Sequence, residues 1–451
     1  MTFLNNDTIC ATATAPGGAI GIVRISGSES ITIASRICCC ITPTTPPRTA
    51  IYTPIMADDK VLDESLVTLF RAPHSYTGED VVEISCHGSR YILNKVLELL
   101  VRQGCRMANP GEFTQRAFLN GQMDLSQAEA VADLISAGNK TTHDMAMSQL
   151  RGHFSSELAQ LREHLLQLTS LLELELDFSD HEELEFADRS ELRSLAERID
   201  ARIRQLARSF EIGQALKQGI PVAIVGKTNV GKSTLLNALL KDDRAIVSDI
   251  HGTTRDTIED TIDINGITFR FIDTAGIRQT ADAIEQIGIE RTYAAIEKAR
   301  IVLWLIDNQP TNAEIADMIA RTQGRTLIPV WNKADIMPAP CEAVSASPVI
   351  PISAKYGQGL DTLEAAIGSA LGLSELSDYD VIVTNARHYD ALTRAHDSLI
   401  RVIDGIDALL PSDLVAEDLR LTIDCLAEIT GSAITPETTL NNIFSHFCVG
   451  K

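Results

Sequence analysis

The chain lacks long apolar runs. No segment approaches the roughly 18–20 consecutive apolar residues that a membrane span needs. The first seven residues, Met1 to Asp7, contain neither the basic region nor the apolar core of a secretory signal. Membrane-transport proteins with spans of their own are therefore excluded, and we expect a cytoplasmic protein with no membrane partner.

A disulfide framework and an excess of positive charge are also missing. The nine cysteines are an odd number, and three are consecutive (Cys38, Cys39 and Cys40), which suits neither paired disulfides nor CxxC zinc ligands. We expect reduced, mostly buried thiols. Lysine and arginine total 39 against 61 aspartates and glutamates, a formal net charge of −22. This balance opposes general attraction to nucleic acid, so any RNA contact must come from a local basic surface or from another protein.

Length and periodicity predict three domains. The 451 residues are 45% hydrophobic and 22% charged, as in globular proteins, and roughly 150 residues per domain gives about three. Residues 1–120 alternate short strand-like runs with turns. Residues 121–217 are helical, and leucines spaced 3, 4, 3 and 4 put one apolar stripe on a long helix. These leucines are Leu158, Leu161, Leu165, Leu168 and Leu172.

The second half of the chain changes pattern twice. Strands alternate with helices over residues 218–371, which predicts a mostly parallel sheet. Residues 372–451 are helical again and end in a short Phe-rich tail. Helical sequence on both sides predicts that the α/β block is inserted into one discontinuous helical domain. The many carboxylates of residues 173–191 could be metal ligands, but we favour a solvated helix end or loop.

A phosphate-binding loop opens the α/β block. The strand-like residues 222–225 lead into residues 226–233 (GKTNVGKS), which fit G-x-x-x-x-G-K-[ST] at every fixed position. Residues 234–240 then form the expected helix. Glycines let the backbone wrap phosphates, Lys232 would reach the β- and γ-phosphates, and Ser233 would ligate Mg²⁺.

Later motifs select guanine. Asn332-Lys333-Ala334-Asp335 follows the strand-like residues 327–331. The carboxylate of Asp335 can accept two hydrogen bonds from guanine N1 and N2, whereas adenine offers no such pair of donors. Residues 353–355 (Ser-Ala-Lys) resemble a further base-contacting loop. The order of these motifs, each after a strand, predicts GTP.

The catalytic position departs from the Ras pattern. Residues 273–276 (DTAG) supply the DxxG switch, with Asp273 near Mg²⁺ and the Gly276 amide on the γ-phosphate. A Ras-like enzyme has a water-positioning glutamine next. Here that residue is Ile277, which cannot orient water. Either hydrolysis is very slow or another group acts. The downstream candidates are Asp282, Glu285 and Glu290, each of which could instead be a solvated helix carboxylate.

Distinctive segments occur along the chain outside the nucleotide-binding motifs already described. They are residues 7–9 (DTI), 21–27 (GIVRISG), 76–80 (YTGED) with Glu83, 86–88 (CHG), 109–121 (NPGEFTQRAFLNG), 124–130 (DLSQAEA), 252–256 (GTTRD) and 447–451 (FCVGK). Through these segments the chain resembles, over essentially its whole length, the MnmE (TrmE) family of tRNA-modification GTPases.

The resemblance implies a multidomain α/β fold: an N-terminal α/β domain, a discontinuous helical domain and an inserted Ras-like P-loop G domain. The N-terminal domain would bind 5-formyl-tetrahydrofolate or a related one-carbon folate, and would dimerise. The partner would be the flavoprotein MnmG (GidA), in a heterotetramer or larger complex. Together they would form a carboxymethylaminomethyl or aminomethyl group at C5 of wobble uridine 34 in certain tRNAs.

The resemblance also supplies an answer to the missing glutamine. Family members use K⁺, which here would be held by Asn229, Ser248, Ile250 and Thr253. A cation there stabilises charge developing between the β- and γ-phosphates. Ser233 and Thr254 would ligate Mg²⁺, and the water-orienting glutamate falls on Glu285. The catalytic set is then Glu285, Asn229 and Lys232.

The implied binding residues fall into two sets. The folate set is Arg24, Glu83, Gln122 and Lys451. The GTP set is Asn229, Val230, Gly231, Lys232, Ser233, Thr234, Ser248, Asp249, Ile250, His251, Gly252, Thr253, Thr254, Asp273, Thr274, Ala275, Gly276, Asn332, Lys333, Asp335, Ser353, Ala354 and Lys355.

Thr228 and Gln122 depart from the family pattern, and Cys448 matches it but has two possible roles. Thr228 replaces the usual P-loop proline, which loosens the loop slightly but removes no ligand. Gln122 replaces a folate-site lysine, so a hydrogen bond remains possible but the charge is lost. Cys448 is either a catalytic thiol or a packing residue, and we favour packing because no base partner is evident.

One rival function remains open: a ribosome-assembly GTPase switch without modification chemistry. Such proteins share similar P-loop and GTTRD segments, but would carry a basic RNA-binding module. Here the flanks of the G domain are acidic and helical. Co-sedimentation with ribosomal subunits, weighed against pull-down of a flavoprotein, would discriminate between the two.

Overall fold

The computed structural model describes residues 7–177, 189–241, 260–272, 293–338, 348–370, 381–433, 437–445, 447 and 450. It divides into two compact units. The first comprises residues 1–136, 146–201 and 391–451, and the second comprises residues 137–145 and 202–390. Across the described residues, no helix is both long and apolar enough to cross a membrane.

The first unit contains a six-stranded sheet near the N-terminus. Its strands are β1 (Ile9–Thr12), β2 (Ile20–Ser26), β3 (Ala50–Ala57), β4 (Lys60–Phe70), β5 (Val81–His87) and β6 (Arg106–Met107). Their order is β3-β4-β5-β2-β1-β6, with antiparallel neighbours except for the parallel pair β1 and β6. The short strand-like runs predicted within residues 1–120 are therefore confirmed, β2 and β5 among them.

Two helices that the sequence analysis did not single out cover one face of this sheet. They are α1 (Ser30–Ile37) and α2 (Arg90–Arg102), and their apolar side chains share one core with the alternate strand residues. The opposite face is not covered by these helices. It carries Arg24 and Glu83, which are register partners, and the exposed cross-strand pair of Tyr52 and Leu66. Period-two alternation of the strands separates the two faces.

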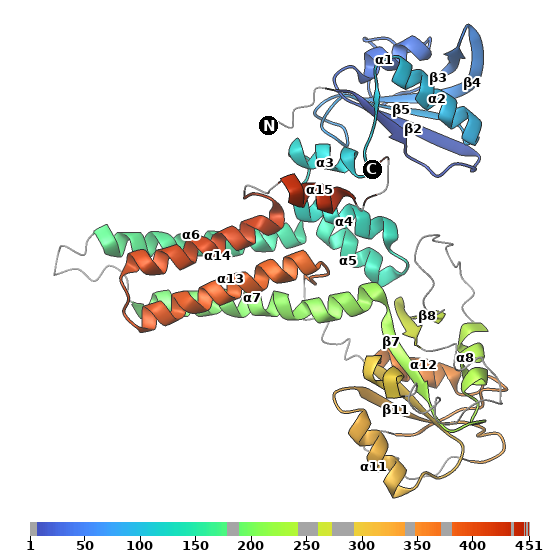
Figure 1. Cartoon of the computed structure of the whole chain (residues 1–451), viewed down its shortest axis with the longest axis vertical. Coiled ribbons are helices and arrows are strands. Elements are labelled where there is room, and N and C mark those ends of the chain that lie inside the picture. Colours follow the sequence, from blue (N-terminus) through green and yellow to red (C-terminus); the bar gives the residue numbers. More distant parts are fainter. Residues whose placement is uncertain are drawn as a thin grey trace. The chain divides into compact units, whose positions relative to one another are not determined.

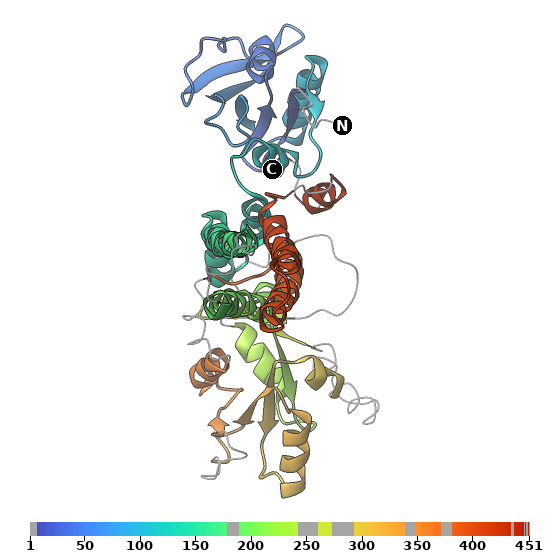
Figure 2. The same ribbon diagram turned by 90° about the vertical axis from the view of Figure 1, so that its left-hand side faces the viewer.

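Long helices follow in the first unit. Helix α6 (His153–Asp177) carries the predicted leucine stripe, whose five leucines are each at most 4% exposed, so the stripe is confirmed as core. Helix α14 (Ser412–Thr430) runs beside α6 in both views (Figures 1 and 2). Other helices come before or after the second sheet along the chain. They are α3 (Glu112–Leu119), α4 (Leu125–Ser136), α5 (Lys140–Leu150), α7 (Arg189–Gln218), α13 (Ala386–Asp407) and α15 (Glu437–Ser445).

The second unit contains the predicted α/β sheet. Its strands are β7 (Ile220–Val225), β8 (Asp260–Ile264), β9 (Ile267–Phe271), β10 (Ile301–Ile306), β11 (Thr326–Trp331) and β12 (Ile350–Pro351). The order is β12-β11-β10-β7-β9-β8, parallel except for the pair β8 and β9. All six residues of β10 are buried, as expected of a central parallel strand. The prediction of a mostly parallel sheet is confirmed.

Helices cover both faces of this sheet (Figure 1). Helices α8 (Lys232–Lys241) and α12 (Leu360–Ser369) pack into one apolar core. Helix α11 (Asn312–Arg321) and residues 293–298 pack into the core on the other face. Helix α11 begins at a capping box in which Thr311 and Glu314 bond each other's backbone N–H. The loops after β7, β10, β11 and β12 all lie at the carboxyl ends of parallel strands, where ligands bind in such sheets.

The cysteines of the described residues form no disulfide with one another. Seven of the nine lie in the described part of the chain, and all seven are free. Cys10, Cys38, Cys86 and Cys105 are buried in the N-terminal core.

Candidate functional site

The loop between β7 and α8 has the geometry of a phosphate cradle. Gly231 has φ +102°, and Asn229 is in the left-handed region at φ +63°. A Cβ atom added at Gly226 would lie 2.4 Å from the Leu305 carbonyl oxygen, and one added at Gly231 would lie 2.3 Å from Asn332 Nδ2. Neither glycine position has room for a side chain, because neighbouring chain segments approach the loop backbone so closely.

Lys232, the first residue of α8, folds back over this loop. Its Nζ donates hydrogen bonds to the carbonyl oxygens of Gly226 at 2.7 Å and Lys227 at 2.8 Å. Burial lowers the pKa of the Lys232 ammonium. The helix N-terminus adds a partial positive charge at the same place. An ammonium and a helix N-terminus together form a ready anion site.

One buried asparagine links this loop to the base-contacting loop. Asn332 is 4% exposed, its Nδ2–H donates to the Val230 carbonyl oxygen at 2.8 Å, and its Oδ1 accepts from the Ala354 N–H at 3.0 Å. The structure therefore brings together the P-loop, the NKAD segment and the Ser-Ala-Lys segment, as the sequence predicted.

The other NKAD residues contact the same two loops. Lys333 Nζ donates to the Asn229 carbonyl oxygen at 3.2 Å and forms an ion pair of 2.6 Å with Asp307 Oδ2. Asp335 Oδ1 accepts a hydrogen bond from Ser353 Oγ at 2.6 Å. That bond orients the carboxylate expected to recognise guanine. Asp307 was not singled out from sequence. Its position directly after a buried strand is the signal that could have found it.

The other members of the predicted GTP set that the structure describes lie in or next to the loops that follow β7 and β12. Val230 is buried in the adjoining core, and Ser233 and Thr234 lie in the first turn of α8. Lys355 has its Nζ 5.1 Å from the centroid of the Tyr356 ring.

Several predicted residues lie outside the described residues. In the nucleotide site they are Ser248, Asp249, Ile250, His251, Gly252, Thr253, Thr254, Asp273, Thr274, Ala275, Gly276, Ile277, Asp282, Glu285 and Glu290. At the C-terminus they are Cys448 and Lys451.

A second polar site lies on the face of the N-terminal sheet opposite α1 and α2. Arg24 donates through Nε to Glu83 Oε1 at 2.9 Å, and its Nη2 lies 2.8 Å from the same oxygen. Its Nη1 donates to the Gly450 carbonyl oxygen at 3.3 Å. The guanidinium carbon lies 5.3 Å from the Tyr76 ring centroid and 5.7 Å from that of Phe113. Cation–π contacts and one carboxylate thus hold the arginine in place.

The C-terminal tail is part of this second site. A Cβ at Gly450 would lie 2.1 Å from the Thr12 carbonyl oxygen, and a Cβ at Gly111 would lie 2.6 Å from the Phe444 carbonyl oxygen. Both glycines permit the tail to lie directly against the N-terminal backbone. Gln122 lies near Gly78, and within the described residues no hydrogen bond or ion pair joins it to Arg24 or Glu83.

A charge network close to the second site was not expected from sequence. Arg116 Nη2 lies 2.6 Å from Asp7 Oδ1 and 3.1 Å from Glu112 Oε1, and its Nη1 lies 3.2 Å from Glu79 Oε1. Arg106 bonds Asp7 at 2.6 Å and Glu112 at 2.5 Å. Burial opposes ionisation of Asp7 and Glu112, but bonds to the two arginines outweigh it and hold the pKa of each carboxyl below its usual value.

Comparison with known proteins gives concordant matches. The family description "MnmE helical domain" matches residues 125–448, and "GTP-binding protein TrmE N-terminus" matches residues 8–122. A tRNA modification GTPase MnmE from Phocaeicola vulgatus is 51% identical, covering 100% of both chains. The protein of that name from Bacteroides thetaiotaomicron is 53% identical, covering 99% of this chain and 100% of its own. The FeoB G-domain structure from Methanococcus jannaschii is 26% identical, covers 34% of this chain and 98% of its own, and has a TM-score of 0.25.

Proposed function

The chain belongs to the MnmE family of tRNA modification GTPases, and we propose that a potassium ion activates its GTP hydrolysis. It is a GTP hydrolase of tRNA modification. The observation that carries the proposal is the pairing of Ile277 after DxxG with Asn229 in the P-loop. An isoleucine cannot orient water, so the charge and water chemistry must come from other groups.

The nucleotide would be held by the two loops that Asn332 joins. Lys232 and the α8 N-terminus face the phosphates, and Asp335 faces guanine, with Ser353 orienting its carboxylate. The residues proposed for Mg²⁺ are Ser233 and Thr254, with Asp273 nearby. When bound, Mg²⁺ neutralises charge on the β- and γ-phosphate oxygens.

The donor chemistry of the proposed K⁺ site fits a hard cation. It consists of an amide oxygen from Asn229 and oxygens from Ser248, Ile250 and Thr253, and oxygen donors suit alkali and alkaline-earth ions. Asn229 has a left-handed backbone conformation, and Lys333 donates a hydrogen bond to its carbonyl oxygen. This bond helps to hold the backbone of Asn229 in that conformation. Glu285 would orient the attacking water. We propose that two G domains approach each other in the GTP state and complete this site.

The test is GTP turnover in KCl and in NaCl at equal ionic strength. We expect turnover on the order of 100-fold faster in KCl, because one transition-state charge contact is typically worth about 100- to 1,000-fold in rate. Asn229→Ala should remove the difference while GDP still binds. Asn312→Ala, an asparagine substitution at the exposed start of α11, is the matched control and should behave as wild type. Equal rates in the two salts would rule out potassium activation.

We propose folate binding at Arg24, Glu83, Gln122 and Lys451. Glu83 can accept hydrogen bonds from N–H donors of a pterin, and Tyr76 and Phe113 offer aromatic surface beside it. When bound, 5-formyl-tetrahydrofolate or a related folate supplies a one-carbon unit. The neutral amide of Gln122 predicts weaker attraction of the folate carboxylates than a lysine would give.

The proposed homodimer is supported by the same sheet face. Tyr52 is 66% exposed, Leu66 48% and Ile20 65%, all on the side opposite α1 and α2. Exposed apolar side chains on one face of a sheet mark an interaction surface.

We propose that the chain divides into domains at the boundaries expected from the sequence. The segments are residues 1–120, 121–217, 218–371 and 372–451.

In the cell we propose that this cytoplasmic protein acts on tRNA with the flavoprotein MnmG. The complex would form the carboxymethylaminomethyl or aminomethyl group at C5 of wobble uridine 34. Mass spectrometry of wobble uridines in tRNA from a strain lacking the gene tests this. The 5-substituted uridine should disappear. Unchanged nucleosides would exclude this role in tRNA modification, but they would not contradict GTP hydrolysis by the protein.

A further inference from the structure

Two residues in the loops of the G domain have left-handed backbone conformations although neither is a glycine. Asn229 has φ +63° and Lys333 has φ +62°. Such a conformation is strained for a residue with a side chain, and it persists where the surrounding structure holds it. The two residues contact each other, because Lys333 Nζ donates a hydrogen bond of 3.2 Å to the Asn229 carbonyl oxygen.

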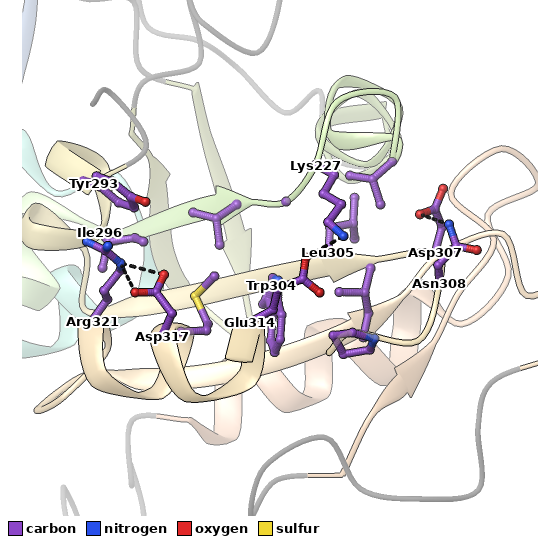
Figure 3. Close-up of a pocket in the computed structure, with 16 residues that line it drawn as sticks. Lys227, Tyr293, Ile296, Trp304, Leu305, Asp307, Asn308, Glu314, Asp317 and Arg321 are labelled. Atoms are coloured by element: carbon purple, nitrogen blue, oxygen red, sulfur yellow. Dashed lines mark hydrogen bonds and ion pairs between the residues drawn. The ribbon is translucent and has the colours of Figure 1, made fainter. Parts of the chain in front are cut away.

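A carboxylate from a third loop bonds the same ammonium group. Asp307 directly follows β10, and its Oδ2 lies 2.6 Å from Lys333 Nζ. Its Oδ1 accepts a hydrogen bond of 3.3 Å from Asn308 Nδ2, which Figure 3 shows as a dashed line. Both carboxylate oxygens therefore have a partner. The ammonium of Lys333 thus joins the loops that follow β7, β10 and β11.

This ion pair differs from an ordinary surface pair in two ways. The side chain of Asp307 is 21% exposed and that of Lys333 is 42% exposed, so solvent screens the pair only in part. The residues directly before the two partners are also joined, because the Asn332 N–H donates to the Ile306 carbonyl oxygen at 2.8 Å. Exposed ion pairs contribute little partly because forming them orders two flexible side chains. Here the backbone already holds both partners close together.

We propose that Asp307 is a positioning residue for the nucleotide, and that it acts by holding Lys333 against the backbone of the P-loop. The inference rests on the proposed placement of GTP between these loops. With the carboxylate present, the ammonium is held at the Asn229 carbonyl, and the P-loop keeps the conformation that wraps the phosphates. Without it, the ammonium turns to solvent and the loop opens more often. GDP should then leave faster, whereas its association, which depends on encounter, should change little.

Release of mant-GDP, a fluorescent GDP analogue, from the full-length protein tests the inference. Excess GDP is added in the presence of Mg²⁺, and the loss of fluorescence is followed. Asp307→Asn keeps the shape of the side chain and removes its charge. The contribution of a half-buried pair lies between those of an exposed pair and a buried charged hydrogen bond, so release should be about five- to tenfold faster. Association should stay within about twofold of wild type. Asp307→Glu, which keeps the charge, should release mant-GDP more slowly than Asp307→Asn.

A double-mutant cycle tests whether Asp307 acts through Lys333. Lys333→Ala alone should also accelerate release, and Asp307→Asn should add no further acceleration in Lys333→Ala protein. Effects that multiply in the double variant would overturn the inference, as would unchanged release from Asp307→Asn. If Lys333→Ala does not bind mant-GDP, the comparison of Asp307→Asn with Asp307→Glu decides, and equal rates from these two variants contradict a role for the charge.

The Asp317–Arg321 pair of α11 provides the matched control. Arg321 Nε donates to both carboxylate oxygens of Asp317, at 2.9 and 2.8 Å, and Figure 3 shows this pair beside Tyr293. Asp317→Asn makes the same change of charge away from the three loops, so release should match wild type. Equal acceleration by Asp317→Asn and Asp307→Asn would overturn the inference. Wild-type protein that binds no mant-GDP would contradict the proposed nucleotide site itself, whereas normal binding with unchanged release from Asp307→Asn contradicts only the role of Asp307.

Discussion

The buried side chain of Asn332 is hydrogen-bonded to the backbone of Val230, with its Nδ2–H donating to the Val230 carbonyl oxygen at 2.8 Å. Its Oδ1 accepts from the Ala354 N–H at 3.0 Å. One amide thus holds the P-loop and the base-contacting loop at a set separation. The spacing of the phosphate and guanine contacts depends on it.

Asn332→Ala should weaken GDP binding. The substitution leaves the Val230 carbonyl and the Ala354 N–H without this partner, a cost of about 1–3 kcal/mol or roughly 5- to 150-fold in affinity. Titration with a fluorescent GDP analogue measures the change. Asn312→Ala on the exposed start of α11 is the control. Wild-type affinity in Asn332→Ala would contradict a role in joining the loops.

Asp335→Asn should change which base is bound. The amide offers a donor where guanine N–H groups need an acceptor, so GTP affinity should fall by about 100-fold. Xanthine carries a carbonyl in place of the guanine amino group, so XTP should bind the variant better than the wild type. Competition between GTP and XTP measures the change. If the variant keeps its preference for GTP, Asp335 does not read the base.

Gly450→Ala should displace the C-terminal tail. The added Cβ would lie 2.1 Å from the Thr12 carbonyl oxygen, and overpacking of this kind typically costs about 1–3 kcal/mol. Calorimetric titration with 5-formyl-tetrahydrofolate should show affinity about tenfold lower or worse. Gly138→Ala, where an added Cβ meets nothing within 4 Å, is the control. Unaltered folate affinity would remove the tail from the proposed folate site.

The charge network around Arg116 should make the N-terminal region sensitive to acid. Asp7 and Glu112 have folded pKa values below their ordinary values of 3.8 and 4.5, so the unfolded state binds more protons as the pH falls. Their stabilising contribution is present above about pH 4.5 and is lost as the pH falls through the folded pKa values. Urea unfolding followed by circular dichroism from about pH 6 to about pH 3 should show this loss.

Arg116→Gln tests the cause. It should destabilise the protein by about 1–3 kcal/mol near pH 6 and flatten the acid dependence, because the carboxylates lose a charged donor. Arg102→Gln removes an exposed ion pair of α2 and should change neither result. An equal acid dependence in wild type and Arg116→Gln would place its origin elsewhere.

Much of the G domain could be predicted from local patterns. Residues 222–240 combine an apolar strand, a glycine loop and a helix in one contiguous segment, and the structure confirms β7 and α8 around that loop. The leucine stripe of α6 was equally visible, because helical spacing is a property of neighbouring residues. Helices α1 and α2 were not singled out beside the stronger strand patterns of residues 1–120.

The amino-acid sequence by itself determined the GTPase motifs, their order along the parallel strands, and the leucine face of the long helix. Only the tertiary structure decided that Asn332 joins two loops, that four charged residues gather around Arg116, and that Gly450 bonds Arg24 across 426 positions. The physical reason is that such contacts depend on how distant segments close and pack. The spacing of neighbouring residues does not determine that arrangement.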